Sequence, residues 1–353
     1  MKMYHPKLLF STAMSKIFHF LSKFFVLWCI PLLLLSSVAF SQKYQENISV
    51  HDPVVIQEGD TFYLFCTGNG IAVWSSLDLK QWRREDPVFS QAPAWAKEIN
   101  ERFRNHIWAP DITFRDGQYY LYYSISAFGK NTSAIGLTVN KTLDKNSQDF
   151  KWEDKGIVVR SVPGRDLWNA IDPNIAYDAN DQVWMSFGSF WEGIKLVRLE
   201  AGMDKTGSGP SDWFTVAKRE RNRDVDDRNA GNAAIEAPFI FKKDNFYYLF
   251  VSFDYCCRGA NSTYKVVVGR SEQIEGPYLD KDGKSMLDGG GTLVVEGNER
   301  WQGVGHNSVY NFQGTDYMFM HGYDGKNEGR SKLLVREVRW DEESWPTIEL
   351  EEF

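Results

Sequence analysis

Three acidic residues, Asp52, Asp172 and Glu236, stand at corresponding places in a pattern that recurs along the chain. Two carboxylates that flank a sugar ring can cleave a glycosidic bond, because one donates a proton to the leaving oxygen while the other activates water. A third carboxylate nearby raises the pKa of the acid by like-charge repulsion. Asp-Pro is a common turn dipeptide, so the shared position, and not any single residue, predicts this chemistry.

The local polarity of each acid predicts its role. Glu236 lies in an apolar stretch from Ala233 to Phe239, and desolvation there favours the neutral carboxyl of a general acid. Asp52 follows His51 in a polar setting, so we expect it to stay ionised and to act as the general base. Asp172 is then the modulator of the acid's pKa.

The elements that must position these acids belong to a repeat of about 60 residues. Each copy has a strand opened by a small polar motif, a turn with Gly, Asp or Asn, and an aromatic strand. The five copies are HDPVVIQEGDTFYLFCT (51–67), APDITFRDGQYYLYYS (109–124), DPNIAYDANDQVWMSFGS (172–189), EAPFIFKKDNFYYLFVS (236–252) and HNSVYNFQGTDYMFMH (306–321). A further β-like segment follows each copy, at 71–82, 134–140, 194–200, 264–271 and 331–340.

This pattern predicts an all-β, five-bladed β-propeller. The first strand of every blade lies closest to the central axis, so residues that open these strands face one another despite their distance in sequence. We align the copies on Pro53, Pro110, Pro173, Pro238 and Ser308. We expect one domain over 42–353, with a short helix in a loop around 93–103 as its main departure from strands. A large β-sandwich is the alternative fold.

The N-terminal 41 residues have the features of a signal peptide. Four lysines and no acids precede an apolar run from Phe24 to Phe40, and Ala39 with Ser41 places small residues ahead of a cleavage point before Gln42. The sequence therefore predicts a secreted or periplasmic protein. An uncleaved membrane anchor is the alternative, which Pro31 and the shortness of the run disfavour.

Composition excludes some partners. Loss of the four leader lysines takes the net charge from −7 to −11, and an acidic surface argues against nucleic acid and anionic membranes. The 13 Trp, 16 Tyr and 24 Phe suit strands and sugar-stacking surfaces. Three cysteines would remain, and of the two states open to Cys256 and Cys257 we expect two reduced, buried thiols in preference to a vicinal disulfide.

The motifs resemble those of glycoside hydrolase family 43, and among its members those of the endo-1,5-α-L-arabinanases. The similar segments are HDP (51–53), IWAPDI (107–112), IDPN (171–174), IEAPFI (235–240), GVGHNSV (303–309), FGSFWEGI (187–194), FDYCCRG (253–259), STYKVVVGRS (262–271) and EGPYLDKDG (275–283). The resemblance covers nearly all of the chain after the leader.

The resemblance implies a five-bladed propeller that hydrolyses α-1,5-linked arabinan in an inverting, single displacement, with Asp52 as base, Glu236 as acid and Asp172 as modulator. The carboxyl groups of the acid and the base are then expected to lie roughly 6.5–9.5 Å apart, which leaves room for the attacking water. The histidine that matches His306 implies a single structural metal ion on the axis, calcium by expectation, with sodium or another hard ion as alternatives. We also expect a monomer.

The same resemblance suggests substrate contacts. Trp108 and Phe128 match positions at which arabinanases stack aromatic rings on arabinose, and Asn174 and Ser189 are candidates for hydrogen bonds to sugar hydroxyls. The charged segment 218–232 is expected to form a solvated loop that leads to Glu236 and shapes the substrate groove.

Two other functions stay open from the sequence. An exo-acting α-L-arabinofuranosidase or β-xylosidase would use the same fold and differ in its loops. A propeller that binds glycan without cleaving it would need no set of three carboxylates, so the retention of all three acids argues against it.

Overall fold

The computed structural model describes Met3 and residues 43–350, and residues 43–350 belong to one compact unit, Lys43–Phe353. The predicted signal peptide, residues 1–41, lies outside the described residues apart from Met3. No helix among the described residues has the length and apolar character needed to cross a membrane.

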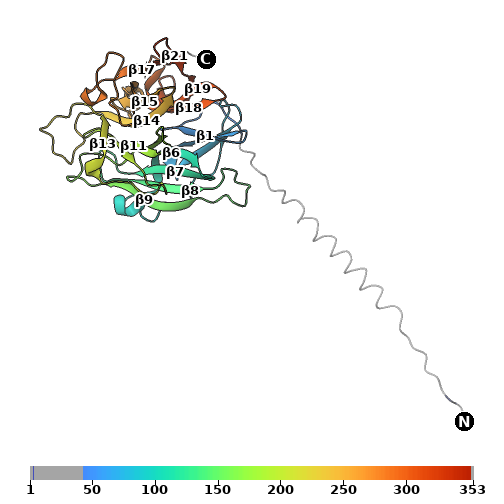
Figure 1. Ribbon diagram of the computed structural model, residues 1–353. Helices are drawn as coiled ribbons and strands as arrows, with labels where there is room; N and C mark the ends of the chain where they lie inside the picture. The colour runs from blue at the N-terminus through green and yellow to red at the C-terminus, as the bar shows by residue number, and fades with distance from the viewer. Residues whose placement is uncertain (1–2, 4–42, 351–353) are drawn as a thin grey trace. The chain divides into compact units, whose positions relative to one another are not determined.

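The described chain folds into five antiparallel sheets that form a β-propeller, which confirms the predicted fold (Figure 1). Blade 1 contains β1 (Val54–Glu58), β2 (Thr61–Cys66), β4 (Ala72–Ser76) and β5 (Arg83–Arg84). Blade 2 contains β6 (His106–Arg115), β7 (Gln118–Ile125), β8 (Ser133–Asn140) and β9 (Glu153–Ser161), and the short β3 (Gly68–Asn69) pairs with its first strand.

The other three blades follow in chain order. Blade 3 contains β10 (Asn174–Tyr177), β11 (Val183–Phe187), β12 (Ile194–Arg198) and β13 (Phe214–Ala217). Blade 4 contains β14 (Ile235–Lys243), β15 (Phe246–Phe253), β16 (Lys265–Ser271) and β17 (Thr292–Glu296). Blade 5 contains β18 (Trp301–Phe312), β19 (Thr315–Asp324) and β20 (Arg330–Glu337), followed by a small pair, β21 (Arg339–Trp340) and β22 (Pro346–Thr347).

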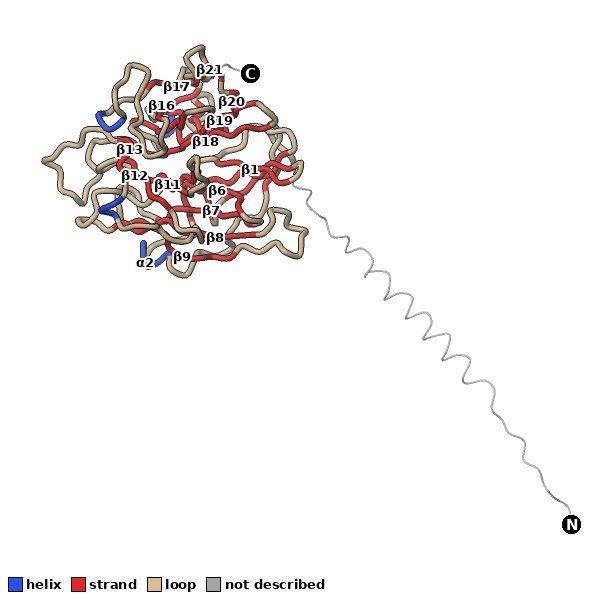
Figure 2. The backbone as a smooth tube through the Cα atoms, in the orientation of Figure 1, coloured by secondary structure: helices blue, strands red, loops and turns tan. Residues whose placement is uncertain are grey.

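The helical parts of the described chain are short turns that connect strands (Figure 2). The predicted helix within 93–103 is a single turn, α2 (Ala96–Ile99). The 3-10 turns are η2 (Pro210–Asp212), η3 (Gly259–Asn261) and η4 (Met286–Asp288). Of these turns, η3 contacts all three strands of blade 5, including its first strand β18.

The first strands of neighbouring blades contact one another around the whole ring, from β1 to β6, β10, β14, β18 and back to β1. An apolar cluster fills each of the five interfaces between blades, including the one between the last blade and the first. At that last interface the backbone of Ile48 accepts a hydrogen bond from Leu333 at 3.0 Å, and Ile48 and Val50 are buried. The segment before β1 therefore helps to close the ring.

Candidate active site

Each blade has one residue with a positive φ before or within its first strand, and these five residues define the axial register. They are Asp52 (φ 55°), Ala109 (39°), Asp172 (58°), Ala237 (56°) and His306 (48°). A left-handed backbone costs a residue with a side chain about 1–2 kcal/mol, so the surrounding structure must hold each one in place.

This register corrects the sequence alignment in the fifth copy. Proline follows the positive-φ residue in four blades and Asn307 follows it in the fifth, so Asn307, and not Ser308, corresponds to the prolines. Glu236 stands one residue before the left-handed position, which Ala237 occupies. The register shift between Glu236 and Phe239 in the β14–β15 pair is a β-bulge, and bulges re-aim side chains.

A belt of hydrogen bonds holds these five residues. In three blades the amide N–H is donated to a hydroxyl at the end of the preceding blade's second strand: Ala109 to Thr67 (2.8 Å), Asp172 to Ser124 (3.0 Å) and His306 to Ser252 (2.9 Å). The matching N–H of Asp52 is donated to Nδ1 of His321 (3.3 Å).

The belt is different between blades 3 and 4, where Gly188 occupies the position of the hydroxyl-bearing residue. The N–H of Gly188 bonds to the carbonyl of Ile171 at 2.9 Å, as expected for that position. A Cβ on Gly188 would lie 2.9 Å from a backbone oxygen, so no side chain fits there. The N–H of Ala237 is donated instead to Oδ2 of Asp172 at 3.2 Å. This bond brings Asp172 beside the residue that follows Glu236.

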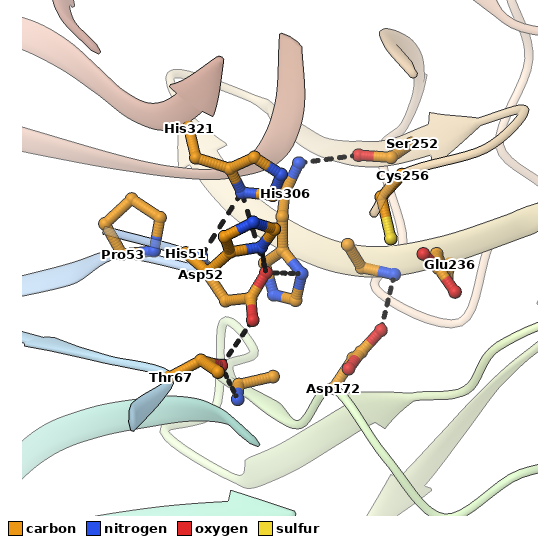
Figure 3. Close-up of polar contacts among 12 residues, drawn as sticks. His51, Asp52, Pro53, Thr67, Asp172, Glu236, Ser252, Cys256, His306 and His321 are labelled. Carbon is orange, nitrogen blue, oxygen red and sulfur yellow. Dashed lines mark hydrogen bonds and ion pairs between the residues drawn. The ribbon is translucent and has the colours of Figure 1, made fainter. Parts of the chain in front are cut away.

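Asp52 is held from several directions (Figure 3). Its Oδ2 accepts a short hydrogen bond from the hydroxyl of Thr67, and its Oδ1 lies 3.0 Å from Nδ1 of His306. The Nδ1 atoms of His51 and His321 lie 3.8 Å and 3.6 Å from the same oxygen. Asp52 is therefore the carboxylate that faces the histidines.

Glu236 has a different environment, in which two hydroxyls bond its carboxyl group. Ser189 contacts Oε2 and Tyr264 contacts Oε1, each at 2.7 Å. Burial and the neighbouring carboxylates raise the pKa of the Tyr264 phenol well above its usual value, so its hydroxyl stays protonated and donates to Glu236. Glu236 has no histidine among its hydrogen-bond partners in the described residues.

The surroundings separate the pKa values of the acids. Burial alone raises the pKa of Asp52, but the charge and hydrogen bond of His306 outweigh it and hold that pKa well below its usual range. Burial raises the pKa of Asp172, and the charges of Glu236 and Asp52 raise it further. Burial also raises the pKa of Glu236, against the two hydroxyls that lower it. The axis thus has one ionised carboxylate and two that favour the protonated form.

The four predicted substrate contacts occupy different environments. Asn174 is buried, and its Oδ1 accepts the N–H of Ile240 at 2.9 Å, which links blade 3 to blade 4. Ser189 is buried against Glu236. Trp108 is half-buried with its indole N–H on His106 (3.0 Å), whereas the Phe128 side chain is 79% exposed. The contact of each residue with a sugar stays a prediction. Asn174 and Ser189 also make hydrogen bonds within the protein, to Ile240 and Glu236, which the sequence did not predict.

Sequence reasoning missed Thr67, Tyr264 and His321 as members of the site. A pattern in the sequence identifies two of them, because four of the five repeat copies end at a belt position, with Thr67, Ser124, Ser252 and His321. Tyr264 opens the third strand of blade 4 and belongs to no recurring position, so only the tertiary structure brings it to Glu236.

The residues that could hold a metal lie on the histidine side. His51, Asp52 and His321 place ligand atoms within 4.8 Å of one another, and His306 does not belong to that group. The Nδ1 of His306 is directed to Asp52, which leaves its Nε2 for a ligand. Asn307 is buried, and both polar atoms of its amide lack a partner among the described residues.

The expectation of reduced, buried thiols is wrong. Cys256 and Cys257 form a vicinal disulfide, and Cys257 is exposed. The loop after β15 turns sharply there, with φ 67° at Cys257, and its N–H is donated to the Tyr323 hydroxyl at 2.7 Å. The turn is local geometry that composition does not reveal. The Cys256 sulfur points to the Glu236 side of the site (Figure 3).

The segment 218–232 is a loop as predicted, but it is not simply solvated. Arg221 is nearly buried within it, bonds to Asp227 at 3.1 Å and donates to the carbonyls of Asp226 and Asn229. The buried Trp191 donates to the carbonyl of Asp227 at 2.8 Å. The loop therefore packs around its own arginine and against blade 3.

Comparisons with known proteins agree with this geometry. The profile of Glycosyl hydrolases family 43 matches residues 46–346. The chain is 53% identical to an extracellular exo-alpha-(1->5)-L-arabinofuranosidase of Cellvibrio japonicus (91% of each chain) and 40% identical to an extracellular endo-alpha-(1->5)-L-arabinanase of Bacillus subtilis (85% and 88%). A solved alpha-L-arabinanase of Cellvibrio cellulosa, complexed with arabinohexaose, superposes with a TM-score of 0.84 at 52% identity, over 86% of this chain and 96% of that one.

Proposed function

The chain belongs to glycosyl hydrolases family 43 and is a glycoside hydrolase, and we propose that its substrate is α-1,5-linked arabinan, which it cleaves within the chain. The observation that carries this proposal is the pairing on one axis of an ionised Asp52 with a Glu236 whose pKa is raised. The substrate class is supported by the printed activities of the similar proteins from Cellvibrio and Bacillus.

In the proposed mechanism Glu236 is protonated before the reaction and donates its proton to the oxygen of the leaving arabinose. Asp52 accepts a proton from a water molecule, whose oxygen attacks the anomeric carbon from the opposite face and inverts its configuration. Asp172 is assigned as the modulator because its carboxyl and that of Glu236 influence each other: the charge of Glu236 raises the pKa of Asp172. The hydrogen bonds to Asp52 from Thr67 and His306 support its assignment as base, because they stabilise the ionised form.

We also propose a single hydrated metal ion, calcium by preference, next to His306. The donor set fits, because a histidine that donates Nδ1–H to a carboxylate can ligate through Nε2, and the unpartnered amide of Asn307 can bond a coordinated water. When bound, the ion would supply positive charge at the axis that keeps Asp52 ionised. Elemental analysis of the purified protein tests its presence and identity.

The experiment that tests the function is product analysis on linear, debranched arabinan. A mixture of oligosaccharides at early times supports endo cleavage, and a β-configured product in fresh digests followed by NMR supports inversion. Glu236→Gln serves as the control, because it keeps the shape of the side chain and removes the proton. If this variant hydrolyses arabinan as the wild type does, the mechanism is wrong.

An exo-acting arabinofuranosidase is the second candidate, favoured by the 53% identity to an exo-acting relative. It predicts one small product from the first turnover, with a slow fall in the viscosity of arabinan. An endo-acting enzyme lowers viscosity early. The extracellular names of both relatives support the proposal that this protein is exported.

A further inference from the structure

The belt of axial hydrogen bonds is closed by a histidine at one point only. Thr67, Ser124 and Ser252 offer a hydroxyl to the next blade's opener, and His321 offers a ring nitrogen to Asp52. A hydroxyl accepts the corresponding N–H in three of the other four blades, so the backbone bond alone does not require an imidazole. The position that differs is the one that faces the proposed base.

The imidazole of His321 makes contacts that a serine cannot reach. The residue is fully buried, and its ring centroid lies 4.1 Å from that of His51, which borders Asp52. Tyr323 packs against both histidines edge-on, with centroids at 5.4 Å and 5.5 Å. His321 thus fixes the Asp52 backbone through Nδ1 and limits the space beside the carboxylate through its ring.

The geometry also defines the protonation of His321. Because Nδ1 accepts the N–H of Asp52, that nitrogen carries no proton and the ring is neutral. Burial and the nearby His51 lower the pKa of His321 well below its usual value, in agreement with a neutral ring. His321 therefore does not compete with His306 as the partner of the Asp52 carboxylate.

We propose that His321 is a positioning residue for the catalytic base: it holds the left-handed backbone of Asp52, and with His51 it directs the carboxylate toward Thr67 and His306. This inference rests on the proposed function for its kinetic consequence, but the hydrogen bond to the Asp52 amide is independent of any activity.

Two substitutions separate the acceptor from the ring. His321→Ala removes both, and His321→Asn places an amide oxygen near the position of Nδ1. We expect His321→Ala to lower kcat on arabino-oligosaccharides by about 10- to 100-fold with KM changed little, because misplacement of a reacting group by about 1 Å costs up to 10²-fold. We expect His321→Asn to recover most of kcat.

Met320→Ala is the matched control. Met320 is fully buried next to His321 on the same strand, where successive side chains point to opposite faces, and it packs in the apolar cluster between blades 4 and 5, so its truncation reports the effect of lost stability. If His321→Ala and Met320→Ala lose the same fraction of kcat at equal thermal destabilisation, or if His321→Asn is as weak as His321→Ala, the proposal is overturned.

Hydrogen exchange of the Asp52 amide gives a readout without substrate. Because the Asp52 N–H is hydrogen-bonded to His321, we expect it to be protected in the wild type, to exchange at least tenfold faster in His321→Ala and to stay protected in His321→Asn. Unchanged exchange in His321→Ala overturns the positioning role. A wild type that leaves arabinan intact would instead contradict the proposed function, so the two failures are distinguishable.

Discussion

The axial site has two sides, the histidine side around Asp52 and the hydroxyl side around Glu236. Both carboxyl groups are buried, but their pKa values are shifted in opposite directions. On the histidine side His306 compensates for desolvation, and the pKa of Asp52 falls. On the hydroxyl side Ser189 and Tyr264 compensate only in part, and the pKa of Glu236 rises. The comparison teaches that the identity of the neighbours, not the depth of burial, separates the pKa of Asp52 from that of Glu236.

The largest expected effect comes from removing either carboxylate. Asp52→Asn and Glu236→Gln should each lower kcat on arabinan by about 10²–10⁴-fold, the usual contribution of a general acid or base. Initial rates on a common substrate measure both. A substrate with an aryl leaving group distinguishes the two variants further. Such a group departs without protonation, so it should rescue the activity of Glu236→Gln only. Equal rescue of both variants would contradict the assignment.

Changing the charge on the histidine side should have the next largest effect. His306→Gln removes the partner that keeps Asp52 ionised, and we expect kcat to fall on the order of 10- to 100-fold. Elemental analysis of the same variant should show loss of the proposed metal. Ser126→Ala is the folding control, because it removes a buried hydrogen bond, to Ser133 in blade 2, away from the residues that bond Asp52. Full activity with unchanged metal content in His306→Gln would refute both roles.

Thr67 joins the belt to the base, so its substitution should weaken both. Thr67→Val keeps the shape but leaves the N–H of Ala109 without its acceptor and removes the hydroxyl that donates to Oδ2 of Asp52. We expect a loss of about 1–3 kcal/mol in the free energy of unfolding and about a tenfold loss of kcat. Urea denaturation and kinetics measure the two effects, and Thr67→Ser should restore both. Failure of serine to restore them would locate the defect elsewhere.

The smallest effect is expected on the hydroxyl side, as a change in pH dependence. Tyr264 stabilises ionised Glu236, so Tyr264→Phe should raise the pKa of Glu236 further. The acid acts in its protonated form, and activity is lost as pH rises through that pKa, so the alkaline limb of the kcat/KM profile should move to higher pH. Ser189→Ala should move it in the same direction. A move toward lower pH in either variant would reverse the sign of the proposed interaction.

Much of the fold was accessible from the sequence because the repeat is regular. The five copies begin and end close to the observed paired strands, and the predicted third strands 134–140, 194–200 and 264–271 match β8, β12 and β16 within two residues at each end. The regular alternation of strand and turn residues is a local property, so it survives in a single sequence.

The errors share one cause, which is backbone geometry that changes within one or two residues. The sequence placed the marker of the fifth copy at Ser308, and the left-handed residue His306 shows that Asn307 takes the place of the prolines. It predicted free thiols at Cys256, and a sharp turn closed a disulfide there. Neither feature follows from composition or periodicity.

The sequence by itself determined the five-bladed ring and the convergence of Asp52, Asp172 and Glu236, because repeated strand openings must meet at the axis. Only the tertiary structure decided which groups face each acid. The histidines around Asp52 come from blades 1 and 5. The hydroxyls that bond Glu236 come from Ser189 of blade 3 and Tyr264 of blade 4. These contacts join residues far apart in the chain, and a pKa depends on distances of a few ångströms that no local pattern encodes.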